Sequence, residues 1–224
     1  MSPLGREWLR PRALKAVRYC DIHTHCLPTD PTAPAVISVD TGEPFMPLPD
    51  RRYAVGIHPW HADVDRLPEL VRRAHHPQVV MIGEAGLDRL AEAPMGMQIE
   101  LFEEQVRLAE ELRKPLVIHC VRAWGELLDV RKRLRPTEPW IVHGFRGKLP
   151  LAEQLLRAGL SLSFGRLHNA DALKVAWEAH RLFIETDDCP IDIVTVYACI
   201  AEELGVSVDA LASDVGRRFA EIIP

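Results

Sequence analysis

Short apolar runs rich in β-branched residues recur along the chain and predict eight buried strands. From the third run onward, segments of helical length and period separate one run from the next. Strand followed by helix, repeated, predicts an α/β protein with a parallel sheet, and eight such strands predict a (β/α)8 TIM barrel. The runs cover residues 17–22, 35–39, 53–57, 79–83, 115–119, 140–143, 160–164 and 182–186.

The segment 97–114 shows the helical pattern most clearly. Ile99, Phe102, Val106 and Ala109 form one apolar stripe along it, as expected for a helix that covers a sheet. The other predicted helices cover residues 65–74, 124–134, 149–158, 170–180, 191–204 and 208–222.

The first two strand–helix units are too short for full helices. The proline-rich stretches LPTDPTAPAV and TGEPFMPLPD fill them, so we expect loops there and a barrel that is slightly abbreviated in its first two units. Residues 1–16 are predicted to be an N-terminal extension, and residues 17–224 a single barrel domain.

The stretch RYCDIHTHCLP places Asp21, His23 and His25 at alternate positions where an apolar run ends. Residues i and i+2 of a strand point to the same side, so two imidazoles at this spacing can converge on one metal ion. Two ordinary polar histidines at a strand end are the alternative.

Metal-binding residue types also end other predicted strands. In a TIM barrel these ends meet at one mouth, where active sites lie. Imidazoles and carboxylates together suit one or two divalent ions such as zinc, manganese or magnesium. One strand-end histidine is easily incidental, but coincidence at five strand ends is much harder to accept. The residues are His23, His25, His58, Glu84, His119, His143 and Asp187.

Basic residues form a second set just beyond the predicted strands. They are Arg89, Arg122, Arg146 with Lys148, and Arg166 with His168. Each alone is typical of a solvated surface charge, but together they predict a cationic rim around the mouth and an anionic substrate such as a phosphate ester. His58, Arg89, Arg122 and Arg146 are the candidate substrate contacts.

Composition narrows the class of protein further. The 224 residues are 47% hydrophobic, enough for one large core, and the net charge of −5 argues against a broadly basic nucleic-acid surface. Five cysteines without a CxxC pair indicate neither a disulfide framework nor a thiolate zinc site. No apolar run is long enough to span a membrane and no secretory signal is evident, so we expect a cytoplasmic protein. We expect it neither to associate with a membrane nor to need an obligate protein partner.

The ordered motifs DIHTH, AVGIHPWHA, MIGEAGLD, PLVIHC, IVHGFRGKLP and FIETDDCP resemble those of the TatD-related metal-dependent hydrolases, a family of amidohydrolase-like barrels. The resemblance runs from about Tyr19 to the C-terminus. It implies a binuclear metal centre in which His23, His25 and Asp187 hold one ion, His119 and His143 hold the other, and Glu84 bridges the pair. Family members are mostly magnesium- or zinc-dependent deoxyribonucleases or phosphodiesterases.

The chain departs from the family pattern at substrate contacts. After the ETD motif it enters a helix almost directly, Arg89 stands where an aromatic residue often follows GLD, and Cys120-Val121-Arg122 replaces a serine–arginine pair. Metal chemistry is therefore supported more strongly than DNA as the substrate.

These observations predict a metal-dependent hydrolase that cleaves phosphodiester bonds, as a DNase or phosphodiesterase, with single-stranded DNA or a small phosphodiester as substrate. The nucleophile would be a hydroxide bridging the metals, because coordination can lower the pKa of water from about 15.7 to about 7. Asp187 would take its proton and return it to the leaving group. A hydrolase of a C–N or ester bond, or a non-catalytic metal-binding barrel, are the alternatives.

Two further pairs of residues near the motifs have two interpretations each. Asp88 and Asp188 could orient imidazoles, but solvated loop acids are favoured, since spacing cannot locate such partners. Trp60 and Trp124 could stack on a base, but packing under loops is favoured.

Overall fold

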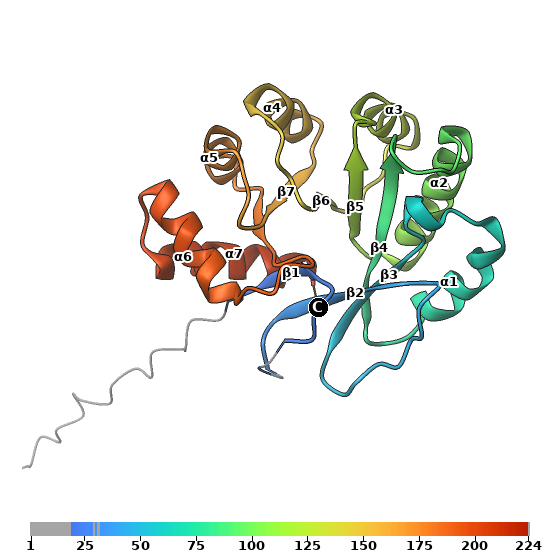
Figure 1. The fold of residues 1–224 in the computed structure, drawn as a ribbon, viewed down its shortest axis with the longest axis horizontal. Helices are drawn as coiled ribbons and strands as arrows, with labels where there is room; N and C mark the ends of the chain where they lie inside the picture. Colours follow the sequence, from blue (N-terminus) through green and yellow to red (C-terminus); the bar gives the residue numbers. More distant parts are fainter. Residues whose placement is uncertain (1–18, 29, 31, 224) are drawn as a thin grey trace, which may run out of the picture.

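The computed structural model describes residues 19–28, 30 and 32–223, and its eight strands form one parallel sheet in the order β1 to β8. The sheet curls into a ring, and the helices lie outside it (Figure 1). The strands are β1 (Asp21–Thr24), β2 (Ala35–Asp40), β3 (Arg52–Gly56), β4 (Val79–Asp88), β5 (Leu116–Val121), β6 (Trp140–Val142), β7 (Ser161–Phe164) and β8 (Leu182–Ile184).

The ring closes between β1 and the residues that follow β8. The amide of His25 donates to the carbonyl of Asp187 at 3.0 Å, and the amide of Asp187 donates to the carbonyl of His23 at 3.0 Å. Thr24 and Asp187 form an isolated parallel bridge. The predicted (β/α)8 TIM barrel is confirmed, and its seam lies at candidate metal ligands.

The helices follow the predicted segments closely. In α2, the side chains of Phe102, Val106 and Ala109 are buried against the sheet, as the apolar stripe predicts. The described residues of the first two connections contain no α-helix, which confirms the abbreviated units. The helices are α1 (Leu67–Ala74), α2 (Met95–Leu112), α3 (Trp124–Leu134), α4 (Leu149–Arg157), α5 (Ala170–Glu178), α6 (Ile193–Leu204) and α7 (Val208–Ile222), with 3-10 turns η1 (Pro59–His61) and η2 (Val64–Arg66).

The first strand begins later than its apolar run predicts. The run starts at residue 17, but β1 starts at Asp21, and residues 17 and 18 lie outside the described residues. The backbone of Cys20 is instead bonded to the hydroxyl of Tyr197, which accepts from the Cys20 amide at 3.1 Å and donates to its carbonyl at 3.0 Å. An apolar run predicts that a segment is buried, but it does not predict which group bonds its backbone. At Cys20 the hydroxyl of Tyr197 bonds the backbone amide and carbonyl.

The fourth strand runs on past its predicted end at residue 83 as far as Asp88. Gly86 makes this possible, because a Cβ added there would lie 1.9 Å from the carbonyl oxygen of His119, and its φ of 153° disfavours other residues. β4 and β5 therefore approach closely at the mouth. This contact brings Glu84 and Asp88 beside His119.

The predicted N-terminal extension, residues 1–16, lies outside the described residues, and the single-domain boundaries stay a prediction. Within the described ranges, none of the helices has both the length and the apolar character needed to cross a membrane.

Candidate metal centre

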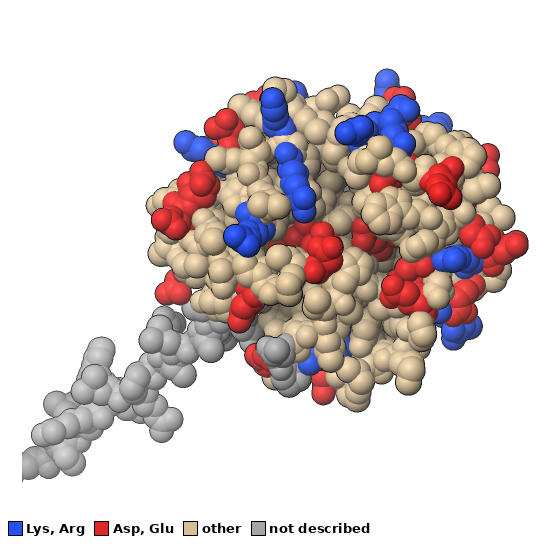
Figure 2. Space-filling view, viewed as in Figure 1, with Lys and Arg blue, Asp and Glu red and all other residues tan. Residues whose placement is uncertain are grey.

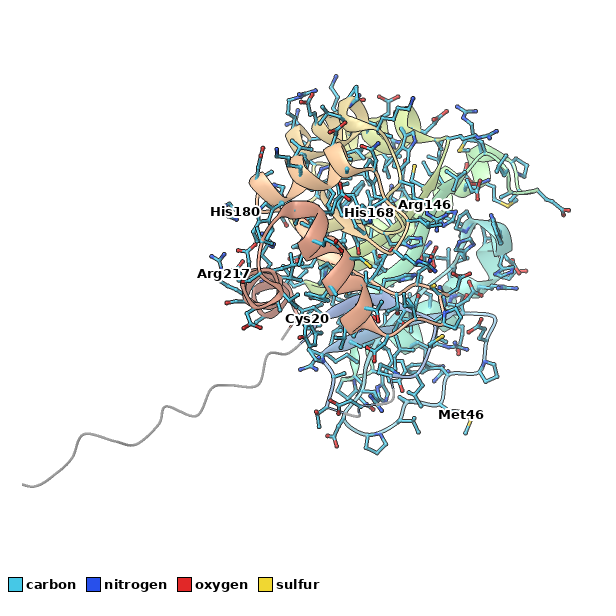
Figure 3. All side chains as sticks on the ribbon, turned by 60° about the vertical axis from the view of Figure 1, so that its left-hand side comes forward. Cys20, Met46, Arg146, His168, His180 and Arg217 are labelled. Atoms are coloured by element: carbon cyan, nitrogen blue, oxygen red, sulfur yellow. The ribbon has the colours of Figure 1, made fainter. Side chains whose placement is uncertain are left out.

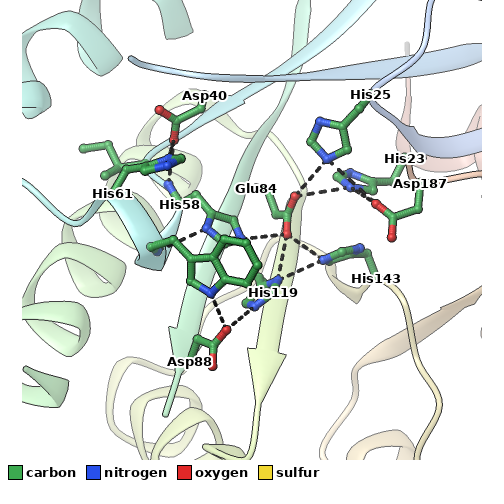
Figure 4. A network of polar contacts seen from close by, with 12 residues as sticks. His23, His25, Asp40, His58, His61, Glu84, Asp88, His119, His143 and Asp187 are labelled. Carbon is green, nitrogen blue, oxygen red and sulfur yellow. Dashed lines mark hydrogen bonds and ion pairs between the residues drawn. The ribbon is translucent and has the colours of Figure 1, made fainter. Parts of the chain in front are cut away.

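The six predicted metal ligands meet at the mouth of the barrel (Figure 4). They come from or directly follow five different strands, whose carboxyl ends face the same side of the ring. His23 and His25 come from the end of β1, Glu84 from β4, His119 from β5, His143 from the residue after β6, and Asp187 from the segment after β8.

One oxygen of Glu84 faces the pair of histidines from the first strand. Its Oε2 lies 3.3 Å from Nε2 of His23 and 3.3 Å from Nε2 of His25. Oδ1 of Asp187 approaches the same two nitrogens at 3.5 and 3.8 Å. Three elements distant in sequence thus supply one compact set of donors.

The other oxygen of Glu84 faces a second set of histidines. Its Oε1 lies 2.8 Å from Nδ1 of His119, 2.7 Å from Nε2 of His143 and 3.2 Å from Nε2 of His58. His58, which we expected to contact a phosphate, therefore lies within the cluster. Each oxygen of Glu84 thus faces its own set of imidazoles, although His23 and His143 also contact each other, with ring centroids 4.3 Å apart.

The donor set fits divalent metal ions. Nε2 of His23 is buried and faces the carboxylates of Glu84 and Asp187 at 3.3 and 3.5 Å, but none of its contacts among the described residues is a hydrogen bond. Buried polar atoms are normally hydrogen-bonded, so an ion held between these donors would satisfy them. Imidazole nitrogens and carboxylate oxygens are the donors that zinc and related ions take. The clusters His23–His143–Asp187, His23–His25–Glu84 and His58–Glu84–His119 each place their donor atoms within 4.8 Å of one another.

Opposite charges set the protonation states of the cluster. Burial alone would raise the pKa of Glu84, but His143, His119 and His23 together hold that pKa well below its usual range. Burial would lower the pKa of His23, yet Asp187 and Glu84 raise it well above the ordinary value. Glu84 and Asp88 likewise outweigh burial and raise the pKa of His119.

These pKa directions predict that protons compete with metal at higher pH than they would at exposed histidines. A ligating imidazole must be neutral, so His23 and His119 must lose protons whose pKa the cluster has raised. We expect the affinity for Zn²⁺ to keep rising with pH above the range in which exposed histidines lose their protons, and binding to release protons. Calorimetric titrations in buffers of different ionisation enthalpy measure both quantities. Affinity independent of pH, with no proton release, would contradict the prediction.

A buried carboxylate orients one of these imidazoles. Oδ2 of Asp88 accepts from Nε2 of His119 at 3.0 Å and from the indole Nε1 of Trp60 at 2.6 Å. Asp88 is 1% exposed, so the favoured interpretation of a solvated loop acid is wrong for it, whereas Asp188 is exposed as expected. Packing under a loop is also wrong for Trp60, which is 62% exposed. Trp124 packs against Phe145 as expected.

Asp21 lies two residues before His23, but its side chain bonds Thr186 rather than a residue of the metal cluster. Its carboxylate accepts from the amide and hydroxyl of Thr186, at 3.1 and 2.6 Å, and burial raises its pKa to about 7. It secures the seam between β1 and the segment after β8.

Glu185 was not among the sequence candidates but lies beside the cluster. It is fully buried, its Oε1 accepts from the amide of Gly144, and the same oxygen lies 3.9 Å from Nδ1 of His143. Burial raises its pKa. Its position two residues before Asp187 is the same alternate spacing that singled out His23 and His25, and could have identified it.

The basic residues do not surround the mouth evenly. The guanidinium of Arg89 pairs with Glu126 and donates to the carbonyl of Arg122, so its charge is partly neutralised. Arg146 and Lys148, after β6, and Arg166, after the neighbouring β7, are exposed and form no ion pair within the described part of the chain. Figure 2 shows acidic atoms in the central hollow and basic side chains on its α4–α5 side.

The loops after β6 and β7 carry these cations toward the mouth. Figure 3 marks Arg146 and His168 on these two loops, while His180 and Arg217 belong to the outer helical layer. Arg122 is exposed at the end of β5, with a φ of 54°. The roles of Arg89, Arg122 and Arg146 in substrate binding stay predictions.

A parallel barrel with histidines and carboxylates converging at its mouth is the arrangement expected of a metal-binding barrel protein. The family described as "TatD related DNase" matches residues 44–215. Because this match covers most of the chain, the chain belongs to that family, and the predicted resemblance is confirmed.

Two relatives illustrate the similarity in sequence. The human "3'-5' RNA nuclease TATDN2" is 35% identical over 149 residues, which are 60% of this chain and 19% of the relative. The "3'-5' ssDNA/RNA exonuclease TatD" of Erwinia billingiae is 40% identical over 113 residues, 48% of this chain and 43% of the relative. The chain therefore spans less than half the length of either relative.

The fold is also found in a crystal structure described as YJJV, a TatD homolog from Escherichia coli. It superposes with a TM-score of 0.76 at 22% sequence identity, covering 92% of this chain and 98% of that one. At this identity the similarity concerns the fold alone.

Proposed function

We propose that this chain uses divalent metal ions to hydrolyse phosphodiester bonds, in single-stranded nucleic acid or in a small phosphodiester. The observation that carries the proposal is the position of Glu84, whose two oxygens face separate groups of imidazoles. The names of the human and Erwinia relatives, which describe nucleases acting on RNA and single-stranded DNA, support the choice of substrate. We further expect the protein to act in the cytoplasm.

The ligand assignment follows the two oxygens of Glu84. His23, His25 and Asp187 would hold one ion, His119 and His143 would hold the other, and Glu84 would bridge them. Zinc, magnesium and manganese are the candidate metals, and the excess of imidazole over carboxylate favours zinc. When bound, such ions lower the pKa of a coordinated water toward neutrality and withdraw charge from a phosphoryl oxygen.

Residues of the chain would supply the remaining steps. Asp187 is the candidate proton acceptor, because its side chain is 25% exposed toward the mouth while Oδ1 faces His23. It would take a proton from the attacking water and pass it to the leaving oxygen. His58 and Arg146 would contact the phosphate, and the exposed cations Lys148 and Arg166 would draw an anionic substrate to the same side.

Metal analysis followed by a substrate panel tests this function. Protein purified without added metal is analysed for bound ions, then assayed on a generic phosphodiester, single-stranded DNA and a set of small amides. We expect bound metal and phosphodiester turnover that a chelator abolishes and added metal restores. Amide hydrolysis alone, or metal binding without turnover of any substrate, would overturn the proposal.

A matched pair of histidine substitutions shows whether turnover comes from this site. His119→Ala should abolish activity, because it removes a donor that lies 2.8 Å from Glu84. His75→Ala should leave activity unchanged, because His75 is an exposed residue at the end of α1, outside the barrel mouth, whose Nδ1 lies 2.8 Å from the carbonyl oxygen of Val71.

A further inference from the structure

Trp60 is held at the mouth in a way that burial cannot explain. It lies in η1, directly after β3, and is 62% exposed. Burying a large aromatic side chain stabilises a fold by about 1.5–3 kcal/mol, and this residue forgoes most of that gain. Its main chain and side chain are nevertheless both fixed by hydrogen bonds.

The two anchors of Trp60 lead directly to the candidate metal centre. Its amide donates to Nδ1 of His58 at 3.1 Å, and its indole Nε1 donates to Oδ2 of Asp88 at 2.6 Å. His58 reaches Glu84 through its other nitrogen, and Asp88 accepts from His119. The indole is thereby held at a fixed position relative to the donors.

The distances place this indole beside two histidines of the candidate metal centre. Its ring centroid lies 5.3 Å from that of His58 and 6.2 Å from that of His119, with interplanar angles of 84° and 72°. Neither imidazole lies parallel to the indole, and the 62% exposure of Trp60 leaves most of its surface open to a planar ligand. Leu90, 63% exposed, lies just beyond Asp88, whose Oδ1 accepts from the Leu90 amide.

We propose that Trp60 is a specificity-determining residue that stacks on the nucleobase adjacent to the scissile phosphate of a single-stranded nucleic acid. The inference deepens the proposed function and rests on it. A base and its phosphate are separated by one sugar, which suits a stacking surface in contact with ligands of the centre. Base–aromatic stacking tolerates any sequence, because every base presents a π face. The exposed cations Arg146, Lys148 and Arg166, which follow β6 and β7, would hold neighbouring phosphates.

Kinetics with intact and abasic oligonucleotides test the role of Trp60. Metal-loaded wild type, Trp60→Leu and Trp60→Phe are compared on a single-stranded oligonucleotide and on the same strand with abasic residues at the cleaved end. For the intact strand we expect Trp60→Leu to raise KM by about 5- to 150-fold with little change in kcat. Trp60→Phe, which keeps an aromatic face, should lie between it and wild type. On the abasic strand the two variants should have the same KM.

Two controls separate stacking from a structural role. Both variants lose the indole donor to Asp88, so Trp60→Leu and Trp60→Phe should match each other in metal content and in hydrolysis of a substrate without a base. Leu167→Ala, which alters another exposed apolar residue on the loop after β7, should leave the difference between intact and abasic strands as in wild type.

The outcomes distinguish the two proposals. Equal losses on intact and abasic strands would show that Trp60 only positions Asp88 and would overturn this inference while leaving phosphodiester hydrolysis in place. Failure of the metal-loaded wild type to cleave any phosphodiester would overturn the proposed function and the inference together.

Discussion

Asp187→Asn should lower turnover by about 10²- to 10⁴-fold while metal stays largely bound, the loss typical of removing a general base. Asparagine keeps the shape of the side chain and one oxygen that can face His23, but it cannot accept a proton near neutral pH. Oδ1 of Asp187 already lies 3.5 Å from Nε2 of His23. The backbone of Asp187 is fixed by its bonds to β1, so the substituted side chain should keep its position.

Steady-state rates and elemental analysis of the same preparation check this expectation. Asp188→Asn is the matched control, because Asp188 is the exposed neighbour and forms no hydrogen bond or ion pair with the cluster among the described residues. Its rates should equal those of wild type. Wild-type turnover in Asp187→Asn would remove this residue from proton transfer. Loss of the metal would instead show that its ligand role dominates.

Glu84→Gln should have the second large effect, and it should act on metal binding first. Both oxygens of Glu84 face imidazole nitrogens, at 2.7–3.3 Å. Glutamine replaces one oxygen by an amide that cannot bind a cation and removes the charge that raises the pKa of His23 and His119. We expect metal affinity to fall by more than the roughly 10- to 100-fold seen when an outer partner of a ligand is lost, and turnover to fall to the metal-free level.

Equilibrium dialysis against Zn²⁺, with rates measured on the dialysed protein, provides the readout. Glu92→Gln is the matched control, since Glu92 is exposed on the loop between β4 and α2, and it should bind metal as wild type does. Undiminished metal content and activity in Glu84→Gln would exclude a bridging role for this carboxylate.

Hydrophobic periodicity was sufficient to predict most of the fold. Apolar runs and helical stripes are local in sequence, and the barrel buries them as their periods require. The start of β1 was the exception, because the hydroxyl of Tyr197, from far along the chain, bonds the backbone of Cys20. The extension of β4 to Asp88 depended on the close approach of Gly86 to His119, which no pattern within β4 reveals.

The order of the motifs along the chain was sufficient to select the candidate ligands. It did not predict how their side chains are arranged relative to one another. Parallel strands bring their carboxyl ends to one side, so residues at six strand ends could be assigned to one mouth. The same logic missed Glu185, although it stands two residues before Asp187. It also left Asp88 among the solvated acids, although that side chain is 1% exposed and bonded to His119.

The sequence by itself determined the class of fold, the family and the residue types that gather at the mouth, because strand periodicity, strand order and side-chain chemistry are written along the chain. Only the tertiary structure decided that the two oxygens of Glu84 face different histidines, that Asp88 joins His119 to Trp60, and that Arg89 is neutralised by Glu126 while Arg146 is not. These contacts involve side chains from separate strands and loops. Their distances depend on how the strands of the barrel pack against one another, which no local sequence pattern specifies.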